Sequence, residues 1–157
     1  MSYLIKAQEK GIIHLDEKAQ TVLYVHQGLR RSLENPEESV QIQAFLRLIF
    51  EYRYPPACIK VCQTVKMGSA RKEADIVAYA DETCQHPILV VECKKEGVSE
   101  SIFREAIEQG FSYAIAIGAS YVWVTSLERE AYFEVWKQAV GERKKNQLHD
   151  IPAFASE

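Results

Sequence analysis

An apolar run that ends in charged residues constrains the fold of this chain most. Residues 88–95 read ILVVECKK, so four consecutive aliphatic residues precede an acid, a cysteine and two lysines. A short continuous apolar run is typical of a strand that is covered on both faces of a sheet. Because successive side chains of a strand point to opposite faces, we expect Glu92 and Lys94 to share one face and Cys93 to lie on the other. The run therefore predicts charged groups at the end of a buried strand.

The rest of the chain predicts two long helices around such strands. Asn35 and Pro36 form a helix start, as N-cap and first helical residue, and the helix is expected to end near Arg53, before two prolines. Ser99 is expected to cap a second helix that ends near Gly118. Strands are predicted at residues 59–65, 75–79, 88–94, 121–125 and 131–136.

This order of elements predicts an α/β fold, an α/β/α sandwich with a mixed sheet and helices on both faces. Two β-rich runs at about residues 10–26 predict an N-terminal β-hairpin, followed by a core at about 35–136 and a tail at about 141–157. A chain of 157 residues suffices for one domain with a core of its own.

Charge and hydropathy exclude several classes of protein. The net charge of −3 argues against a dedicated nucleic-acid-binding module, although Arg71-Lys72, Lys94-Lys95 and Arg143-Lys144-Lys145 leave room for a local basic groove. No apolar segment approaches the length of a membrane span, and the start lacks the apolar region of a signal peptide, so a cytoplasmic protein is expected. The cysteines lack the spacing of a zinc site, and reduced thiols are expected.

Two carboxylates are expected to meet in the sheet. Asp75 begins the strand before Glu92, and a hairpin of the two strands can place both acids side by side. Neighbouring buried carboxylates repel each other, and a divalent cation such as Mg²⁺ relieves this repulsion. Lys94 beside the cation can hold or deprotonate a water molecule, which gives a workable phosphodiesterase site. The alternative is an exposed Glu92–Lys94 ion pair, worth under about 1 kcal/mol.

The second long helix adds an amide and a phenol on one face. Gln109 and Tyr113 are four residues apart and so are neighbours on the helix surface. Without further context, an amphipathic edge residue and a core aromatic account for this pair better than a functional role does.

Together these residues resemble a known nuclease family. Asp75 followed by Glu92-x-Lys94 resembles the PD-(D/E)xK nuclease superfamily, and Gln109-x3-Tyr113 resembles a motif of its RecB-like branch. The runs PEESVQ, ADIV and VVECKK, over a region of roughly residues 10–136, are most similar to the N-terminal nuclease domain of type I restriction enzyme R subunits. The resemblance implies a restriction-endonuclease-like α/β/α sandwich with a mixed central sheet.

The resemblance also implies roles for single residues. Asp75 and Glu92 would be metal ligands, with the Cys93 backbone carbonyl as a third, and Lys94 would act on the attacking water. Glu38 would match an acid on the first helix that reaches the site, but it is equally placed to complete a capping box with Asn35.

The resemblance assigns further residues to DNA contact or to support of the site. Gln109 and Tyr113 would touch DNA or support the site. Gln41 would belong to the same DNA-binding or supporting residues, although it stands where the resemblance predicts an arginine. Ala74 replaces the proline of the motif. Both differences leave the acids and the lysine in place.

The implied activity is that of an endodeoxyribonuclease that uses Mg²⁺, with Mn²⁺ as a second candidate. The chain has no Gly-x4-Gly-Lys-Ser/Thr loop, so no ATP site is expected in it. Expected partners are DNA and the motor, methylation or specificity subunits of a restriction system, with no membrane. Two alternatives stay open, namely a non-catalytic DNA-binding or assembly module on the same fold and a structure-specific resolvase, which would act as a homodimer.

Overall fold

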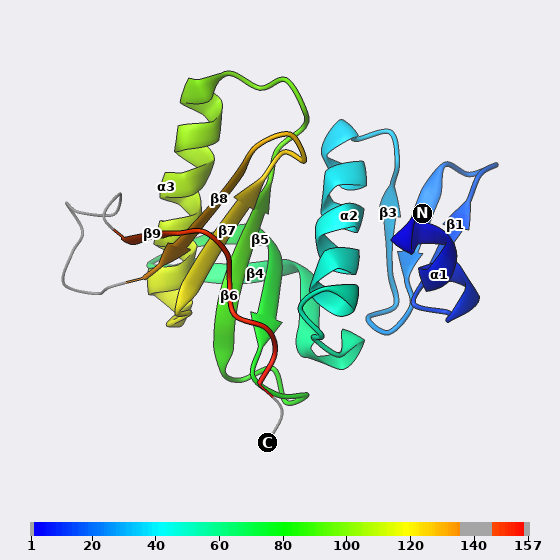
Figure 1. The fold of residues 1–157 in the computed structure, drawn as a ribbon, viewed down its shortest axis with the longest axis horizontal. Helices are drawn as coiled ribbons and strands as arrows, with labels where there is room; N and C mark the ends of the chain where they lie inside the picture. Colours follow the sequence, from blue (N-terminus) through cyan, green and yellow to red (C-terminus); the bar gives the residue numbers. More distant parts are fainter. Residues whose placement is uncertain (1, 136–145, 156–157) are drawn as a thin grey trace.

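The computed structural model describes residues 2–135 and 146–155, and a six-stranded mixed sheet forms the centre of this part (Figure 1). The strand order is β4-β5-β6-β7-β8-β9. The strands are β4 (Ile59–Met67), β5 (Ala70–Tyr79), β6 (Pro87–Cys93), β7 (Tyr121–Thr125), β8 (Glu130–Glu134) and β9 (Gln147–Leu148). β6 and β7 are parallel, and all other neighbours are antiparallel. The prediction of a mixed sheet is therefore confirmed.

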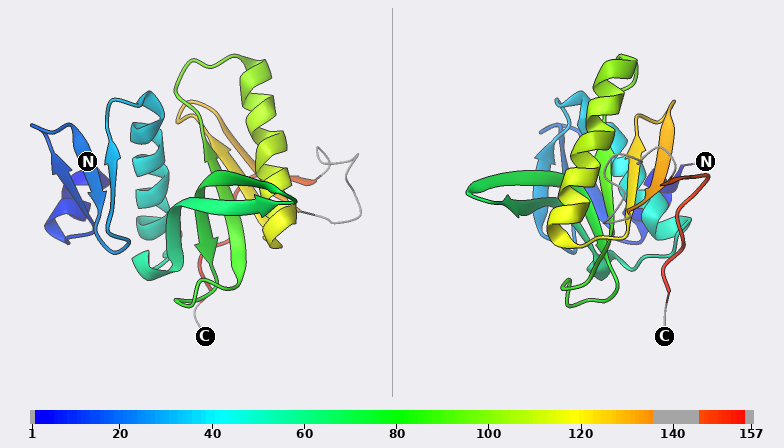
Figure 2. Two further views of the ribbon diagram at one scale, coloured as in Figure 1. Left: turned by 180° about the vertical axis from the view of Figure 1, so that it is seen from behind. Right: turned by 90° about the vertical axis from the view of Figure 1, so that its left-hand side faces the viewer.

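One long helix covers each face of the sheet (Figure 2). Helix α2 (Pro36–Phe50) packs on the face that carries Val91 and Cys93, and α3 (Glu100–Ile117) packs on the face that carries Val90 and Val124. The expected start of α2 is confirmed, because the Asn35 side chain accepts a hydrogen bond from the N–H of Glu37 at 2.9 Å. A short 3₁₀ helix, η1 (Pro56–Cys58), follows α2 and leads into β4.

Both ends of α3 are also as predicted. The Ser99 hydroxyl accepts a hydrogen bond from the N–H of Ile102 at 3.2 Å, and Gly118 ends the helix in the left-handed region at φ +79°.

Gly110 in the middle of α3 allows the helix to approach the sheet closely. A Cβ at this position would lie 2.7 Å from Val122 Cγ1 and 3.6 Å from Glu92 Cγ. The stem of Glu92 therefore lies directly beneath α3.

The N-terminal part forms a small sheet of its own on the outer side of α2 (Figure 1). The predicted hairpin is present as β1 (Ile13–Asp16) and β2 (Thr21–Tyr24), which pair antiparallel. A third strand, β3 (Leu29–Ser32), and the helix α1 (Tyr3–Glu9) were not predicted. The ring of Tyr24 packs edge-on against Phe45 of α2, with 5.1 Å between the ring centroids. α2 is thus covered on both sides.

The β4–β5 hairpin extends beyond the sheet. β6 pairs with β5 only from Ile76 onward, so residues 63–74 form a two-stranded ribbon that projects from the molecule (Figure 2). Cys62, which faces Asp75 across the hairpin, has a left-handed backbone at φ +56°. Val61 packs in the core under α2, whereas Val65 packs in the core under α3. The strand therefore rotates between Val61 and Val65, opposite Asp75, so that its inward-facing side chains change from the α2 face to the α3 face.

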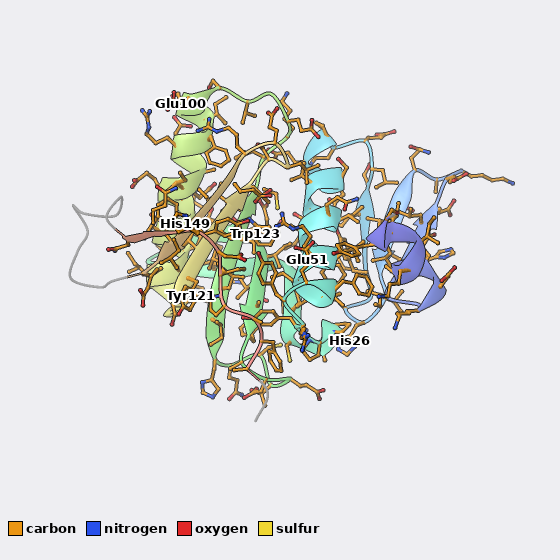
Figure 3. All side chains as sticks on the ribbon, viewed as in Figure 1. His26, Glu51, Glu100, Tyr121, Trp123 and His149 are labelled. Carbon is orange, nitrogen blue, oxygen red and sulfur yellow. The ribbon has the colours of Figure 1, made fainter. Side chains whose placement is uncertain are left out.

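A partly buried polar cluster joins α2 to strands β7 and β8 of the sheet. Trp123, labelled in Figure 3, is fully buried, and its indole N–H donates to Glu130 Oε2 at 2.6 Å. Arg47 of α2 lies 4.7 Å from the indole centroid and forms an ion pair with the same glutamate. The predicted last strand is present up to Glu134, whereas Trp136 and the basic run Arg143-Lys144-Lys145 lie outside the described residues.

Candidate functional site

The sheet opens between β5 and β6 where Asp75 and Glu92 face each other. The last regular pair of the two strands is Ile76 with Val91, which places the two acids at the next position. There the N–H of Asp75 donates to Glu92 Oε2 at 3.0 Å, and the N–H of Cys93 donates to Asp75 Oδ2 at 2.7 Å. Side-chain carboxylates thus take the place of ladder carbonyls. The structure brings the two acids together as the hairpin register predicted.

The surroundings of both acids favour their neutral forms. Burial raises the pKa of Asp75 to about 6, while the hydrogen bond from Cys93 opposes the shift. Burial, and then the negative charge of Asp75, raise the pKa of Glu92 well above its ordinary value. Glu92 is only 3% exposed. A cation bound between the two carboxylates would offset the cost of ionising them side by side.

Lys94 lies next to the two acids but pairs with a third. Its Nζ is 3.7 Å from Glu37 Oε2, in the first turn of α2, and its N–H donates to the Thr125 carbonyl at 2.9 Å. After burial and the nearer groups, the charge of Glu37 also raises the pKa of both Asp75 and Glu92, while Lys94 lowers them. Glu37 is therefore a residue of this site that the sequence analysis missed. Its only signal was its place beside Glu38 in an acidic first turn.

Glu38 and Gln41 lie in a different network. Glu38 is 2% exposed, and its carboxylate accepts hydrogen bonds from Tyr24 Oη at 2.7 Å, Arg31 Nε at 3.1 Å and Gln41 Nε2 at 3.0 Å. The capping-box interpretation is wrong, because these donors occupy the Glu38 side chain and the N–H of Glu38 bonds to the Asn35 carbonyl. Glu38 and Gln41 thus join α2 to the small sheet, and their predicted roles in a metal shell and in DNA binding stay predictions.

Gln109 and Tyr113 form the expected pair on α3. Gln109 Nε2 donates to Tyr113 Oη at 2.7 Å. Tyr113 is buried, and burial followed by the charge of Glu92 raises its pKa, which places the phenol on the side of the acids. Gln109 is exposed and lines a pocket of about 350 Å³ together with Lys94 and Ala106. The lysine and the glutamine therefore face the same open space.

Cys93 turns its side chain away from this space. The thiol is buried on the α2 face, where burial and then the charges of Asp75 and Glu92 raise its pKa, so an inert neutral thiol is the expected state. Its backbone carbonyl as a metal ligand stays a prediction.

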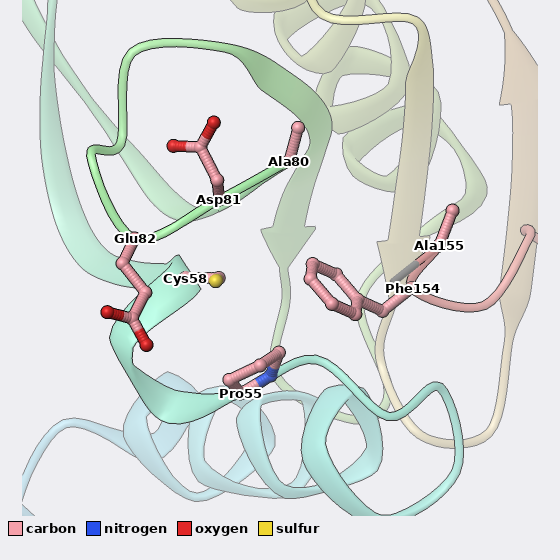
Figure 4. Close-up of a pocket in the computed structure, with 7 residues that line it drawn as sticks. All are labelled: Pro55, Cys58, Ala80, Asp81, Glu82, Phe154 and Ala155. Carbon is pink, nitrogen blue, oxygen red and sulfur yellow. The ribbon is translucent and has the colours of Figure 1, made fainter. Parts of the chain in front are cut away.

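A second pocket lies at the opposite end of β5, about 17 Å further along the strand from Asp75, at a rise of about 3.3 Å per residue. It has a volume of about 430 Å³. Figure 4 shows the side chains that line it. Its lining consists of Pro55, Cys58, Ala80, Asp81, Glu82, Phe154 and Ala155. None of the predicted site residues takes part in it.

The donor groups at the Asp75 site suit a hard divalent cation. Within residues 2–135 and 146–155, no three His, Cys, Asp or Glu side chains are grouped as a complete metal site. Asp75 and Glu92 nevertheless each use one carboxylate oxygen for a backbone N–H, and no hydrogen bond to the other oxygen is formed in this part of the chain. Mg²⁺ is commonly held by one or two carboxylates, with waters and substrate phosphate as the remaining ligands. The pair therefore fits Mg²⁺.

Across the described residues, no helix combines the length and the apolar character needed to pass through a membrane.

Comparisons with known proteins agree with the arrangement of these elements. The solved structure described as a fragment of an HsdR subunit of a type I restriction enzyme from Vibrio vulnificus YJ016 matches with a TM-score of 0.52 and 19% identity. The match covers 74% of this chain and 23% of that chain, so the present chain spans less than a quarter of that relative. A search of curated proteins finds no match.

The family assignment comes from the sequence. The family model "Type I restriction enzyme R protein N terminus" matches residues 36–152, which include α2, the whole β4–β8 region and all of the candidate site. This region is well over half of the chain. The chain therefore belongs to the family of type I restriction enzyme R protein N-terminal domains.

Proposed function

We propose that this chain is a DNA endonuclease domain that depends on Mg²⁺ or Mn²⁺. In this proposal its sheet and two covering helices are the restriction-endonuclease-like α/β/α sandwich of the PD-(D/E)xK superfamily. The observation that carries the proposal is the contact between Asp75 and Glu92 at the opening of the sheet, with Lys94 beside them. The family assignment supports a nuclease-like role in a restriction system.

The residues of the site divide the chemistry among them. Asp75 and Glu92 would hold the cation, which when bound supplies positive charge to a scissile phosphate and acidity to a water. Lys94 would orient the attacking water and offset the negative charge that builds up on the phosphate. Glu37 holds the Lys94 ammonium at 3.7 Å and so positions it beside the acids. Gln109 and Tyr113 would support the site from α3 or contact the DNA.

A cleavage assay tests this function. Purified chain is incubated with supercoiled plasmid, linear duplex and branched DNA in Mg²⁺, Mn²⁺ or EDTA. We expect nicking or cutting only with the divalent cations, and Glu92→Gln or Lys94→Ala should lower the rate at least about a hundredfold. Glu9→Gln, an exposed change on α1, serves as the matched control and should cut like the wild type.

The alternatives predict different outcomes. DNA that is bound but left intact at high protein concentration, without cation binding in calorimetry, would establish a non-catalytic binding module. Cutting confined to branched DNA by a dimer would establish a resolvase. Partner subunits that supply a motor, methylation or specificity are expected to deliver the DNA, since a chain with a net charge of −3 attracts it only weakly.

A further inference from the structure

The ribbon of residues 63–74 carries positive charge next to the acidic site. Lys66, Arg71 and Lys72 are exposed, and Glu73 is the one acid of the ribbon, which leaves it net positive on a chain of net charge −3. The positive ribbon lies directly beside the acidic site, because its second strand continues into Asp75. The ribbon also projects to one side of the sheet (Figure 2).

The arrangement of these charges is unfavourable for folding alone. Lys66 and Arg71 are direct partners across the two strands of the ribbon. Like charges at directly opposed positions destabilise an antiparallel pair. Within the described residues, no ion pair is formed by Lys66, Arg71 or Lys72. A negatively charged ligand would relieve this repulsion.

The ribbon is nevertheless held firmly. Val65 is fully buried and Met67 partly buried in the core under α3. Met67 lines a shallow hollow together with Ser112 and Ala116 of that helix. These packed residues fix the position of the ribbon, so a ligand would not have to order the ribbon before binding to it.

Arg71 lies close enough to the acids to contact the same stretch of DNA backbone. Arg71 is four residues from Asp75, which is about 13 Å along a strand that rises about 3.3 Å per residue. One strand of a duplex advances about 3.4 Å per phosphate along its axis, so this distance corresponds to about four nucleotides. A two-stranded ribbon also fits the width of a major groove.

We infer that the ribbon of residues 63–74 binds the phosphate backbone of duplex DNA beside the cleavage site, with Lys66 and Arg71 as its main contacts. This inference rests on the proposed function for the identity of the ligand. Val65 and Met67 face α3, so Lys66 and Arg71 lie on the opposite face of the ribbon. The inference therefore assigns the DNA path to the face of the ribbon that points away from α3.

The test measures binding of a labelled 30-base-pair duplex at several salt concentrations, with Ca²⁺ in place of Mg²⁺. Lys66→Ala/Arg71→Ala is compared with Lys10→Ala/Lys18→Ala, which removes two exposed lysines of the N-terminal part. We expect the first variant to bind roughly tenfold or more weakly at 0.1 M salt, and its log–log salt slope to be smaller by about 1.8. The second variant should match the wild type. The thermal midpoint of the first variant should not fall, because a like-charge pair has been removed.

The possible outcomes separate this inference from the proposed function. A salt slope of Lys66→Ala/Arg71→Ala equal to that of the wild type would overturn the ribbon as a DNA contact, even if the wild type cuts DNA. Absence of duplex binding by the wild type would overturn it as well. If the wild type binds with the expected slope difference but never cuts, the ribbon stands and the nuclease proposal fails.

Discussion

The N–H of Asp75 donates a hydrogen bond to Glu92 Oε2 at 3.0 Å, across the point where β5 and β6 separate. A second bond, from the N–H of Cys93 to Asp75 Oδ2 at 2.7 Å, completes the exchange. Each acid thus replaces a ladder carbonyl, and backbone groups fix both carboxylates in place. Because the same carboxylates are buried side by side, the folded chain bears a repulsion that a cation would remove.

This repulsion predicts an unusual dependence of stability on pH without divalent cations. The folded pKa of Asp75 is about 6 against an ordinary 3.8, and that of Glu92 is also raised, so the folded state binds more protons above about pH 4. Stability from these groups therefore falls as pH rises through the folded pKa values. The thermal midpoint of Asp75→Asn/Glu92→Gln relative to wild type, measured in EDTA, should increase from pH 4 to pH 7 by about 6–12 °C. A difference that stays constant with pH would contradict the assigned shifts.

A cation should reverse this loss. Mg²⁺ at about one hundred times its dissociation constant is expected to stabilise the wild type by about 2.7 kcal/mol at pH 7.5. The effect should shrink below pH 6, where protons compete for Asp75. Asp75→Asn/Glu92→Gln is the control, and calorimetry of thermal unfolding is the measurement. An equal shift of the double variant would place the cation elsewhere.

Substitution of the neighbouring acids Glu37 and Glu38 by glutamine should affect stability and cleavage differently. Glu37→Gln removes a half-exposed ion pair with Lys94, so the free energy of unfolding should change by less than about 0.5 kcal/mol. Cleavage should nevertheless slow about tenfold in kcat with little change in KM, because Lys94 loses its positioning partner. Retention of full kcat in this variant would remove Glu37 from the site.

Glu38→Gln should give the opposite result. Three donors, from Tyr24, Arg31 and Gln41, lose a buried charged acceptor, and the free energy of unfolding should fall by about 2 kcal/mol or more. Chemical denaturation of both variants measures this difference. An unchanged midpoint for Glu38→Gln would show that the network carries no net stability.

One part of the site could be predicted from the sequence, and another part could not. The pairing of Asp75 with Glu92 was predictable, because a short connection makes their strands neighbours. The alternation of strand side chains then determines the face on which each acid lies. The orientation of α2 was not predictable. It depends on the packing of Tyr24 and Arg31 from the small sheet, and Arg31 lies in a strand that has no apolar alternation to identify it.

The course of the ribbon was unpredictable for a similar reason. Its basic residues could be recognised as charged surface, but its turn over α3 depends on the left-handed backbone of Cys62, a residue type that rarely adopts this conformation. Only tertiary packing of Val65 and Met67 explains it.

Gly110 offers a test of the contact between α3 and the acids. Alanine at this position would gain about 1 kcal/mol of helix propensity, but its Cβ would lie 2.7 Å from Val122 Cγ1 in the rigid β7 strand. We expect Gly110→Ala to lower the free energy of unfolding by about 1–2 kcal/mol, because α3 must move away from the sheet. Glu92 Cγ is the next nearest atom at 3.6 Å, so the same movement should loosen the site and slow cleavage. Ser101→Ala, on an exposed turn of α3, is the matched control and should change the free energy of unfolding by less than about 0.5 kcal/mol and leave cleavage unchanged. A stabilised and fully active Gly110→Ala would mean that α3 does not hold Glu92 in place.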